Sequence, residues 1–278
     1  MFTISKPIVS VDWLHENLDQ PNLIIIDASL QKVTIKTDDN FKENVYIKNA
    51  RFLDIKNIFS DTSAPFPNTL LLPDKFEGKA QELGINSDSV IVVYDVYGYY
   101  SCARVWWMFK AMGHHNIAVL DGGLPCWKDA KYPIQEKEER VVEKGNFKVK
   151  YTAGLIHDYR KVLNSIANKK MTIVDARSYN RFLGVEPEPR KGLRSGHIPN
   201  SISLPFADLL NGTKMKSPKE LIKLFSTFKN EHFIFSCGSG ITACILALGA
   251  EIAGINNKSV YDGSWTEWGS LTDLPIEK

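Results

Sequence analysis

A cysteine that follows a short apolar run and opens a glycine-rich turn is the residue in this sequence best placed to do chemistry. The stretch FSCGSGITAC covers residues 235–244, and Cys237 is its third residue. Gly238 and Gly240 permit backbone conformations that turn N–H groups inward, and a helix expected from Ile241 adds its positive dipole end. Both features stabilise a thiolate. The pattern predicts a reactive cysteine, and the alternative is a buried structural thiol.

The same loop can hold an additional anionic sulfur on that cysteine. Backbone N–H groups would surround the sulfur, and Ser239 and Thr242 can add hydroxyl donors. A cysteine phosphatase would need an arginine six residues after Cys237 to bind phosphate oxygens, but that position is Ala243. A Walker-type nucleotide loop is excluded because no Gly-Lys-Ser/Thr sequence follows. The loop therefore favours sulfur chemistry over phosphate chemistry.

The chain carries the same landmarks twice, in the same order and at nearly constant separation. The matched pairs are Asp27 in LIIIDASL with Asp175 in MTIVDARS, Asp95 in SVIVVYD with Cys237 in HFIFSC, and Asp121 in AVLDGGLPCW with Asp262 in SVYDGSWTEW. The period is too long for a solenoid, so the repeat predicts two homologous domains. We place the N-terminal domain at residues 1–135, a highly charged linker at 136–150 and the C-terminal domain at 151–278.

Each half alternates short β-branched runs with helical stretches, which predicts α/β domains with parallel sheets covered on both faces by helices. In the second half we expect strands in TIVDA, SISLP, HFIFS and KSVYD, and helices at 156–168, 217–228 and 241–254. Ser217 is expected to cap the second of these helices, with Pro218 in its first turn. Ligands of such folds bind outside the carboxyl ends of the strands, which is where Cys237 falls.

The composition is that of an ordinary globular protein. The chain has 278 residues, of which 44% are hydrophobic and 24% charged, and its net charge of +2 argues against nucleic-acid binding by bulk charge. The apolar runs are too short to span a bilayer, and the N-terminal residues lack a signal-peptide pattern. We expect a cytoplasmic protein without a membrane or nucleic-acid partner, with an organelle matrix as the alternative. The four cysteines and six histidines show no metal-like spacing, so neither a metal nor a cofactor is expected.

Together these motifs resemble the tandem rhodanese family, sulfurtransferases that carry sulfane sulfur as a cysteine persulfide. The resemblance covers nearly the whole chain and is strongest at residues 104–127, 174–206, 237–243 and 261–268. It implies two rhodanese-like domains, each with a five-stranded parallel sheet and helices on both faces. It also implies an inactive N-terminal domain, because Asp95 stands where Cys237 stands in the other half.

The loop sequence distinguishes two classes of sulfur donor. Thiosulfate-using members of the family resemble CRKGVT, whose basic side chains face the sulfonate, whereas the neutral Gly238 and Ser239 are similar to the CGSGVTA loop of members that use 3-mercaptopyruvate. The resemblance implies that Arg181 and Arg190 bind the carboxylate and keto group of that donor. We expect 3-mercaptopyruvate as the donor; a thiosulfate:cyanide sulfurtransferase on the same scaffold, or a non-catalytic sulfur carrier, is the alternative.

The implied reaction is covalent and has two steps. The thiolate of Cys237 takes sulfur from the donor and releases pyruvate, and the persulfide then passes sulfur to a thiol such as thioredoxin, or to cyanide. The predicted catalytic residues are Cys237, Ser239 and Thr242, and the predicted substrate-binding residues are Arg181, Arg190, Gly238, Gly240 and Ile241.

The sequence departs from the family pattern at one place. Family members that use mercaptopyruvate have a proposed proton relay of an aspartate, a histidine and the loop serine. The corresponding stretch, residues 52–73, carries Lys56 at the aspartate position and Asn68 at the histidine position. Ser239 would then have no histidine base, so either the relay is dispensable or the enzyme favours another donor.

Overall fold

The computed structural model describes residues 2–33, 44–137, 142–168, 170–228 and 232–278, and the chain forms two compact units. The first comprises Met1–Asp61, Leu70–Thr152 and Asn211–Met215, and the second comprises Thr62–Thr69, Ala153–Leu210 and Lys216–Lys278. Two short segments, 62–69 and 211–215, therefore belong to a different unit from the residues that flank them in sequence. The repeat in the sequence did not predict this exchange.

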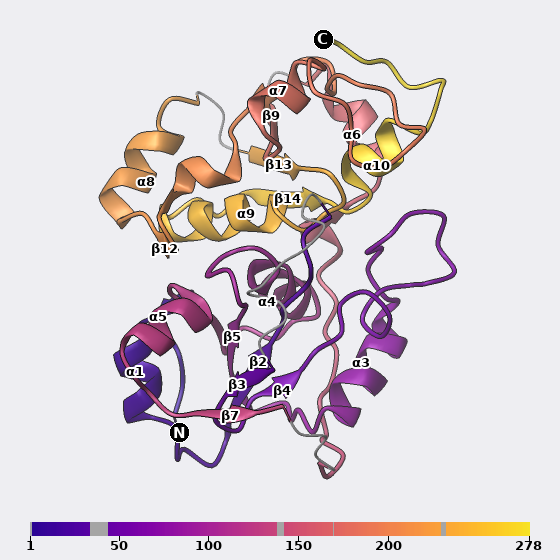
Figure 1. Ribbon diagram of the computed structural model, residues 1–278. Helices are drawn as coiled ribbons and strands as arrows, with labels where there is room; N and C mark the ends of the chain where they lie inside the picture. The colour runs from indigo at the N-terminus through magenta and orange to yellow at the C-terminus, as the bar shows by residue number, and fades with distance from the viewer. Residues whose placement is uncertain (1, 34–43, 138–141, 169, 229–231) are drawn as a thin grey trace. The chain divides into compact units, whose positions relative to one another are not determined.

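The first unit is built on a parallel sheet. The five strands in the described part of the chain are β1 (Ile8–Val9), β2 (Leu23–Asp27), β4 (Arg51–Phe52), β5 (Val90–Tyr94) and β6 (Ile117–Leu120). Their order is β1-β6-β5-β2-β4, and every pair is parallel (Figure 1). The central strand β5 is entirely buried, as expected where both faces of a parallel sheet are covered. A separate antiparallel pair joins β3 (Val45–Ile47) to β7 (Ile134–Glu136).

Helices cover both faces of this sheet. They are α1 (Val11–Glu16), α3 (Pro73–Glu82), α4 (Cys102–Ala111) and α5 (Gly123–Asp129). Val92 and Tyr94 of β5 share a hydrophobic cluster with Leu14 of α1 and Trp127 of α5. Because side chains alternate along a strand, the intervening Val93 points to the other face. Helix α4 contacts β5 and β6 without joining that cluster, so it covers this second face.

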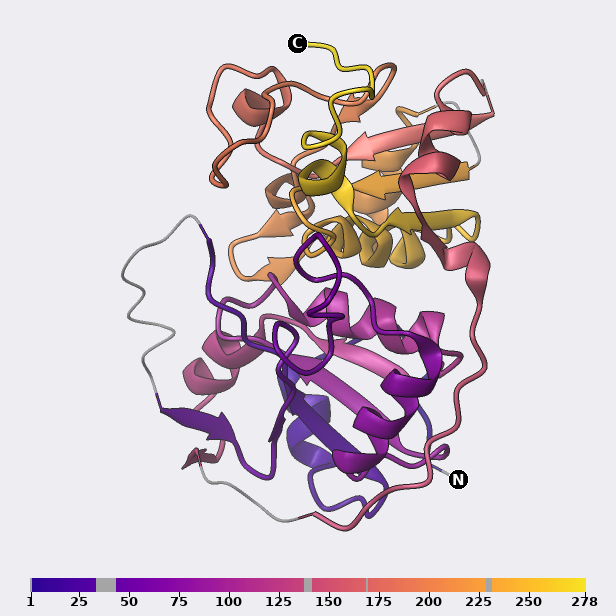
Figure 2. The same ribbon diagram turned by 90° about the vertical axis from the view of Figure 1, so that its right-hand side faces the viewer.

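The second unit repeats the same order of strands. Its strands are β8 (Ile156–His157), β9 (Met171–Asp175), β10 (Ile202–Ser203), β13 (His232–Ser236) and β14 (Lys258–Tyr261). Among the described residues they form a parallel sheet in the order β10-β9-β13-β14-β8, with β13 at the centre (Figure 2). A further pair links β11 (Leu210–Asn211) with β12 (Lys214–Met215) where the chain enters the segment 211–215 of the first unit.

Helices again pack on both faces of the second sheet. They are α6 (Tyr159–Ser165), α7 (Tyr179–Phe182), α8 (Pro218–Phe225), α9 (Ala243–Ile252) and α10 (Ser264–Trp268), with short 3-10 turns η1 (Ala153–Leu155) and η2 (Phe206–Leu209). Ile234 of β13 packs in one cluster with Trp265 of α10. Phe233 and Phe235 point the opposite way, with ring centroids 6.1 and 6.2 Å from that of Phe225 in α8. The α/β architecture predicted from the sequence is confirmed.

The three helices predicted in the second half are present, but each ends two or three residues earlier than predicted, at Ser165, Phe225 and Ile252. Ser217 caps α8 as predicted: its side chain accepts the N–H of Glu220, whose carboxylate accepts the N–H of Ser217 in return. Residues 156–157, expected to be helical, instead form the edge strand β8, which pairs with β14. Asp158 then accepts the N–H of Lys161, so α6 begins only after this cap.

The described residues 142–150, which lie in the segment expected as a linker, belong to the first unit. Phe147 is 1% exposed, and its ring centroid lies 6.2 Å from that of Phe76 and 5.7 Å from that of Phe109. Its backbone N–H donates to the carbonyl of Ile85 at 3.0 Å. This segment is therefore anchored in the hydrophobic core beside α3 and α4.

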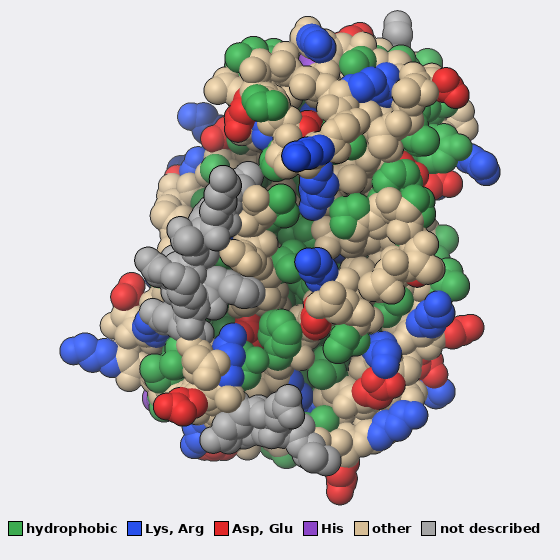
Figure 3. Space-filling view, turned by 45° about the vertical axis from the view of Figure 1, so that its right-hand side comes forward, with side chains coloured by type: hydrophobic (Ala, Val, Ile, Leu, Met, Phe, Trp, Pro, Cys, Tyr) green, Lys and Arg blue, Asp and Glu red, His purple; other side chains and the backbone are tan. Residues whose placement is uncertain are grey.

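The surface carries charges of both signs. Acidic and basic side chains are interspersed over the face shown in Figure 3, without a large area of one sign. Within the described ranges no helix is both long and apolar enough to cross a membrane.

The anchoring of Phe147 predicts a loss of stability when its ring is removed. Phe147→Ala should lower the free energy of unfolding by about 3–5 kcal/mol, because a buried ring is replaced by a cavity. Phe52→Ala is the matched control, since that ring is 40% exposed, and it should change stability by less than about 1 kcal/mol. Urea unfolding followed by tryptophan fluorescence measures both. Equal losses in the two variants would show that the 142–150 segment is not anchored.

Candidate active site

Cys237 directly follows the central strand β13 and stands ahead of α9. Its carbonyl accepts the N–H of Trp265 at 2.9 Å, and its own N–H donates to Ser264 Oγ at 3.1 Å. Only 1% of the residue is exposed. The loop after β13 is thus held by the start of α10, and the thiol is enclosed by these two elements.

The turn from Cys237 to α9 has the conformation that its glycines predict. Gly240 has φ of 75°, which a residue with a Cβ rarely adopts. Thr242 is the residue before α9, and its side chain makes no capping hydrogen bond to the helix. In the first turn of α9, the N–H groups of Cys244 and Ile245 donate back to the carbonyls of Ile241 and Thr242, at 3.2 and 3.0 Å. Donors for a negative charge at the end of β13 therefore have to come from the loop that leads into the helix.

The corresponding loop of the first unit shows such a charge in place. Asp95 follows the central strand β5, as Cys237 follows β13. Its Oδ2 accepts the N–H groups of Tyr100, Ser101 and Cys102 at 2.8, 2.8 and 3.0 Å, and its Oδ1 accepts that of Tyr97 at 2.8 Å. This geometry is a nest of backbone donors around one anion. We expect the repeated loop after Cys237 to place backbone N–H groups around the thiolate in the same way.

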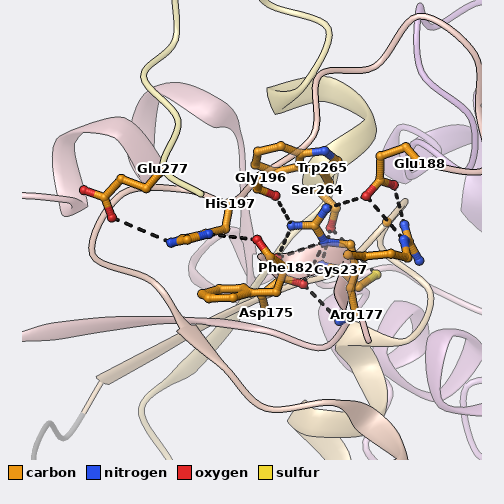
Figure 4. Close-up of polar contacts among 12 residues, drawn as sticks. Asp175, Arg177, Phe182, Glu188, Gly196, His197, Cys237, Ser264, Trp265 and Glu277 are labelled. Atoms are coloured by element: carbon orange, nitrogen blue, oxygen red, sulfur yellow. Dashed lines mark hydrogen bonds and ion pairs between the residues drawn. The ribbon is translucent and has the colours of Figure 1, made fainter. Parts of the chain in front are cut away.

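Beside the cysteine loop, a buried arginine joins two carboxylates (Figure 4). Arg177 donates to Asp175 Oδ2 at 2.7 Å and to Glu188 Oε1 at 2.6 Å, and its guanidinium carbon lies 4.3 Å from the ring centroid of Trp265. The side chains of Arg177 and Glu188 are 0% and 2% exposed. Glu188 also accepts from Arg181, with Nη2 at 2.5 Å. Two arginines therefore share one buried carboxylate.

Arg181, a predicted substrate-binding residue, lies against the cysteine loop. A Cβ on Gly238 would lie 3.2 Å from Nη2 of Arg181, closer than ordinary van der Waals contact. Glycine at position 238 therefore lets the guanidinium approach the loop, and a larger side chain would displace it. The structure brings together Arg181 and Gly238, which the sequence assigned to the same site.

Arg190, the second predicted substrate-binding arginine, contacts the loop at Ser239. Its Nη2 donates to Ser239 Oγ at 3.4 Å. Nδ2 of Asn68 also donates to Ser239 Oγ, at 3.0 Å. Asn68 thus lies at the position relative to the serine that the alignment gave to a histidine. Lys56, assigned to the aspartate position, is exposed.

Arg177, Glu188 and Ser264 were missed by the sequence analysis. Glu188 stands two residues before Arg190 in EPEPR. The available signal was an acidic residue that lies in sequence between the two predicted arginines, Arg181 and Arg190. Ser264 lies within YDGSWTEW, a motif used only as a repeat landmark. Its φ is 49°, its hydroxyl donates to the carbonyl of Tyr261 at 2.8 Å, and its Oγ lies 3.9 Å from Sγ of Cys237.

His197 has a packing role near this network. Its ring is stacked on that of Phe182 at 3.8 Å between centroids, and Nδ1 lies 2.9 Å from the Phe182 carbonyl. Glu277 approaches the other ring nitrogen at 3.7 Å (Figure 4). The described part of the chain contains no group of three or more His, Cys, Asp or Glu that could hold a metal ion.

In the second unit, Arg177 balances the charge of Asp175 at the end of β9. The first unit has no arginine at the equivalent place after β2. Asp27 corresponds to Asp175, but Ser29 occupies the place of Arg177. Ser29 donates its N–H and hydroxyl to Asp27 Oδ1, and Nζ of Lys137 lies 3.8 Å from Oδ2. Burial raises the pKa of Asp27 to about 6, against the opposing hydrogen bonds from Ser29.

Comparison with known proteins gives the same result for both halves of the chain. A family model described as the rhodanese-like domain matches residues 10–130 and 158–271. The Arabidopsis thaliana protein named thiosulfate/3-mercaptopyruvate sulfurtransferase 1, mitochondrial, is 38% identical over 98% of this chain and 78% of that protein. Human 3-mercaptopyruvate sulfurtransferase is 36% identical over 95% of this chain and 92% of that protein.

A solved structure is similar over the same extent. The crystal structure of SseA from Escherichia coli, described as a 3-mercaptopyruvate sulfotransferase with the rhodanese fold, has a TM-score of 0.84 at 30% identity. The match covers 94% of this chain and 99% of that one.

The shared carboxylate of Glu188 predicts a specific loss of stability. Glu188→Gln removes the charge between Arg177 and Arg181 and should lower the free energy of unfolding by about 3 kcal/mol, because a buried cation loses its partner. Glu186→Gln, at an exposed position on the same loop, should have little effect. Thermal unfolding distinguishes them. If both variants melt like the parent protein, the buried network contributes nothing to stability.

The raised pKa of Asp27 predicts a pH-dependent contribution to stability. The folded state holds the proton more tightly than the unfolded chain, so Asp27 stabilises most below its ordinary pKa of 3.8. That contribution is lost as the pH rises towards about 6. The stability of the parent protein relative to Asp27→Asn should therefore fall between these values and stay constant above them. Urea unfolding at several pH values measures this difference; a pH-independent difference would contradict the prediction.

Proposed function

The chain belongs to the rhodanese family of sulfurtransferases, and we propose that it transfers sulfane sulfur from 3-mercaptopyruvate through a persulfide on Cys237, releasing pyruvate. The observation that carries this choice of donor is the neutral loop beside the two arginines. Gly238 and Ser239 add no charge to the loop, while Arg181 and Arg190 reach it from outside. The name of the human relative supports the same donor.

The donor step exchanges one bond to sulfur for another. The thiolate of Cys237 attacks the thiol sulfur of mercaptopyruvate, and an S–S bond forms as the C–S bond breaks. The electron pair of that bond leaves on carbon as the enolate of pyruvate, which takes up a proton. The backbone N–H groups of the loop between Cys237 and α9 stabilise the negative charge on the outer sulfur, in the way that the equivalent loop holds the carboxylate of Asp95.

The charge around the loop suits a donor with one carboxylate. Arg177 and Arg181 carry two positive charges against the two negative charges of Asp175 and Glu188. Arg190 adds one further positive charge. Mercaptopyruvate brings a single carboxylate and a keto oxygen, both of which accept from guanidinium groups. Thiosulfate is a compact dianion, and the loop offers it no cationic side chain of its own.

The acceptor step restores the thiolate. A nucleophilic thiolate or cyanide attacks the outer sulfur, the S–S bond breaks, and Cys237 is released as the thiolate. We include thioredoxin-type thiols among the acceptors and a cytoplasmic location in this proposal. Ser239 and Thr242 supply hydroxyl donors to the site, and Gly240 and Ile241 supply backbone N–H groups.

The first unit has no nucleophile at the position that corresponds to Cys237, directly after β5. Asp95 stands there, and its carboxylate occupies the N–H nest itself. A carboxylate cannot hold a sulfane sulfur as a persulfide. We therefore assign the chemistry to the C-terminal domain, residues 151–278, and a non-catalytic role to the N-terminal domain, residues 1–135.

Thiosulfate as the preferred donor is the second candidate. It is supported by the name of the Arabidopsis relative, which gives both donors. Comparison of kcat/KM for the two donors separates the candidates. The proposal requires mercaptopyruvate to have the higher value, and a higher value for thiosulfate would replace it.

The persulfide itself is tested by intact mass. The protein should gain the mass of one sulfur atom with mercaptopyruvate and lose it on addition of cyanide. Cys237→Ser should not gain it, since no thiolate is left at the end of β13. Cys126→Ser is the matched control, because Cys126 is the one partly exposed cysteine and lies in the first unit, and it should load normally. Sulfur loading in Cys237→Ser equal to that of the parent would rule out this mechanism.

A further inference from the structure

Asn68 contacts Ser239 of the cysteine loop through two hydrogen bonds from one atom. Its Nδ2 donates to Ser239 Oγ at 3.0 Å and also lies 3.4 Å from the carbonyl oxygen of Ser239. The two residues are 7% and 8% exposed, and both belong to the second unit. This contact joins the segment 62–69 to the loop that carries the nucleophile.

The carbonyl oxygen fixes which end of the Asn68 amide faces the loop. A carbonyl can only accept a hydrogen bond, so the atom that approaches it has to be the NH2 group and not the amide oxygen. The same NH2 group is the one within reach of Ser239 Oγ. Asn68 is therefore a donor to the serine hydroxyl, and the hydroxyl is the acceptor.

The serine hydroxyl receives a second donor, from Arg190. Nη2 of Arg190 lies 3.4 Å from Ser239 Oγ, and a guanidinium has no acceptor to offer in return. A hydroxyl oxygen has two lone pairs and one proton. With both lone pairs facing N–H donors, the proton of Ser239 points in the one remaining direction. Among the described residues no acceptor for that proton is hydrogen-bonded to Ser239 Oγ.

We propose that Asn68 is a positioning residue that holds the Ser239 hydroxyl as a hydrogen-bond donor to the sulfur donor, and that Ser239 acts without a base. This inference rests on the proposed function. As the C–S bond of a 2-oxo acid breaks, negative charge grows on the keto oxygen, and a fixed O–H donor stabilises it. The hydroxyl keeps its proton throughout, and the proton that the enolate takes up comes from water.

The Asn68 side chain is an amide and does not titrate, which bears on the pH dependence of the donor step. The ionisable groups on the described elements around Ser239 are Arg190, Arg181, Glu188 and the thiol of Cys237. Asn68 adds no group that titrates between acid and neutral pH. A histidine at this position would add one, with an ordinary pKa of about 6.5.

Two substitutions test this positioning, and the backbone tolerates both. Asn68 has φ of 63°, a region in which Asn, Asp and His are the favoured residues other than glycine. Asn68→Asp keeps the shape but replaces the NH2 donor by an acceptor, so the Ser239 proton turns to the new carboxylate. Asn68→His adds a titrating ring. Asn257→Asp is the matched control, at an exposed position of the same unit.

The measurement is the single-turnover rate of persulfide formation with mercaptopyruvate. We expect Asn68→Asp to lower that rate, and with it kcat, by roughly 10² at saturating donor, the order found when one fixed donor is lost. The discharge of preformed persulfide to cyanide should keep its rate, which a merely structural role would not predict. Asn68→His should add a limb near pH 6.5 to the rate profile that the parent protein lacks.

The outcomes separate this inference from the proposed function. If the parent protein fails to gain sulfur from mercaptopyruvate, the proposed function is wrong. If the parent loads while Asn68→Asp loads and turns over at the same rate, the positioning role is wrong and the function stands. If Asn68→His shows no limb near pH 6.5 beyond those of the parent profile, position 68 does not act on the donor step through Ser239, and the inference is wrong.

Discussion

A loop that leads into a helix follows the central strand of each sheet, and in the first unit its backbone N–H groups bind a negative charge. In the first unit the carboxylate of Asp95 accepts four of these groups directly. In the second unit the same place after the strand is taken by Cys237, which can supply that charge only as a thiolate or a persulfide. The residue at this repeated position thus differs between the units, and a cysteine can carry sulfur there whereas an aspartate cannot.

Charged side chains around the cysteine loop form a buried network of ion pairs. Arg177 is held between Asp175, Glu188 and the ring of Trp265, so a full guanidinium is buried with its charge compensated. Glu188 then also fixes Arg181 against the loop at Gly238. In the proposed site, Arg181 is therefore held in place before a donor arrives, which reduces the entropy lost on binding.

The sequence was sufficient for the features that depend on local pattern. The glycine spacing located Cys237 on a strand-to-helix loop, and the repeated landmarks predicted two parallel sheets because each motif ends a strand. Glu188 was missed because its role depends on two arginines that only the fold brings to it. The strand β8 was missed because two residues followed by a helix cap carry no strand pattern, and only pairing with β14 defines them. The placement of 142–150 was not predictable, since charged residues conceal the one anchoring ring of Phe147.

The exchange of segments between the units has a consequence for synthesis of the chain on the ribosome. Asn68 and its partner Ser239 are 171 residues apart in sequence, yet both belong to the second unit. The segment 62–69 emerges early and has to wait until the last strands have been translated before its contacts form. The first unit waits in the same way for residues 211–215. Neither half therefore completes its native contacts as an independent co-translational product, and cutting the gene at the repeat boundary separates each unit from part of itself.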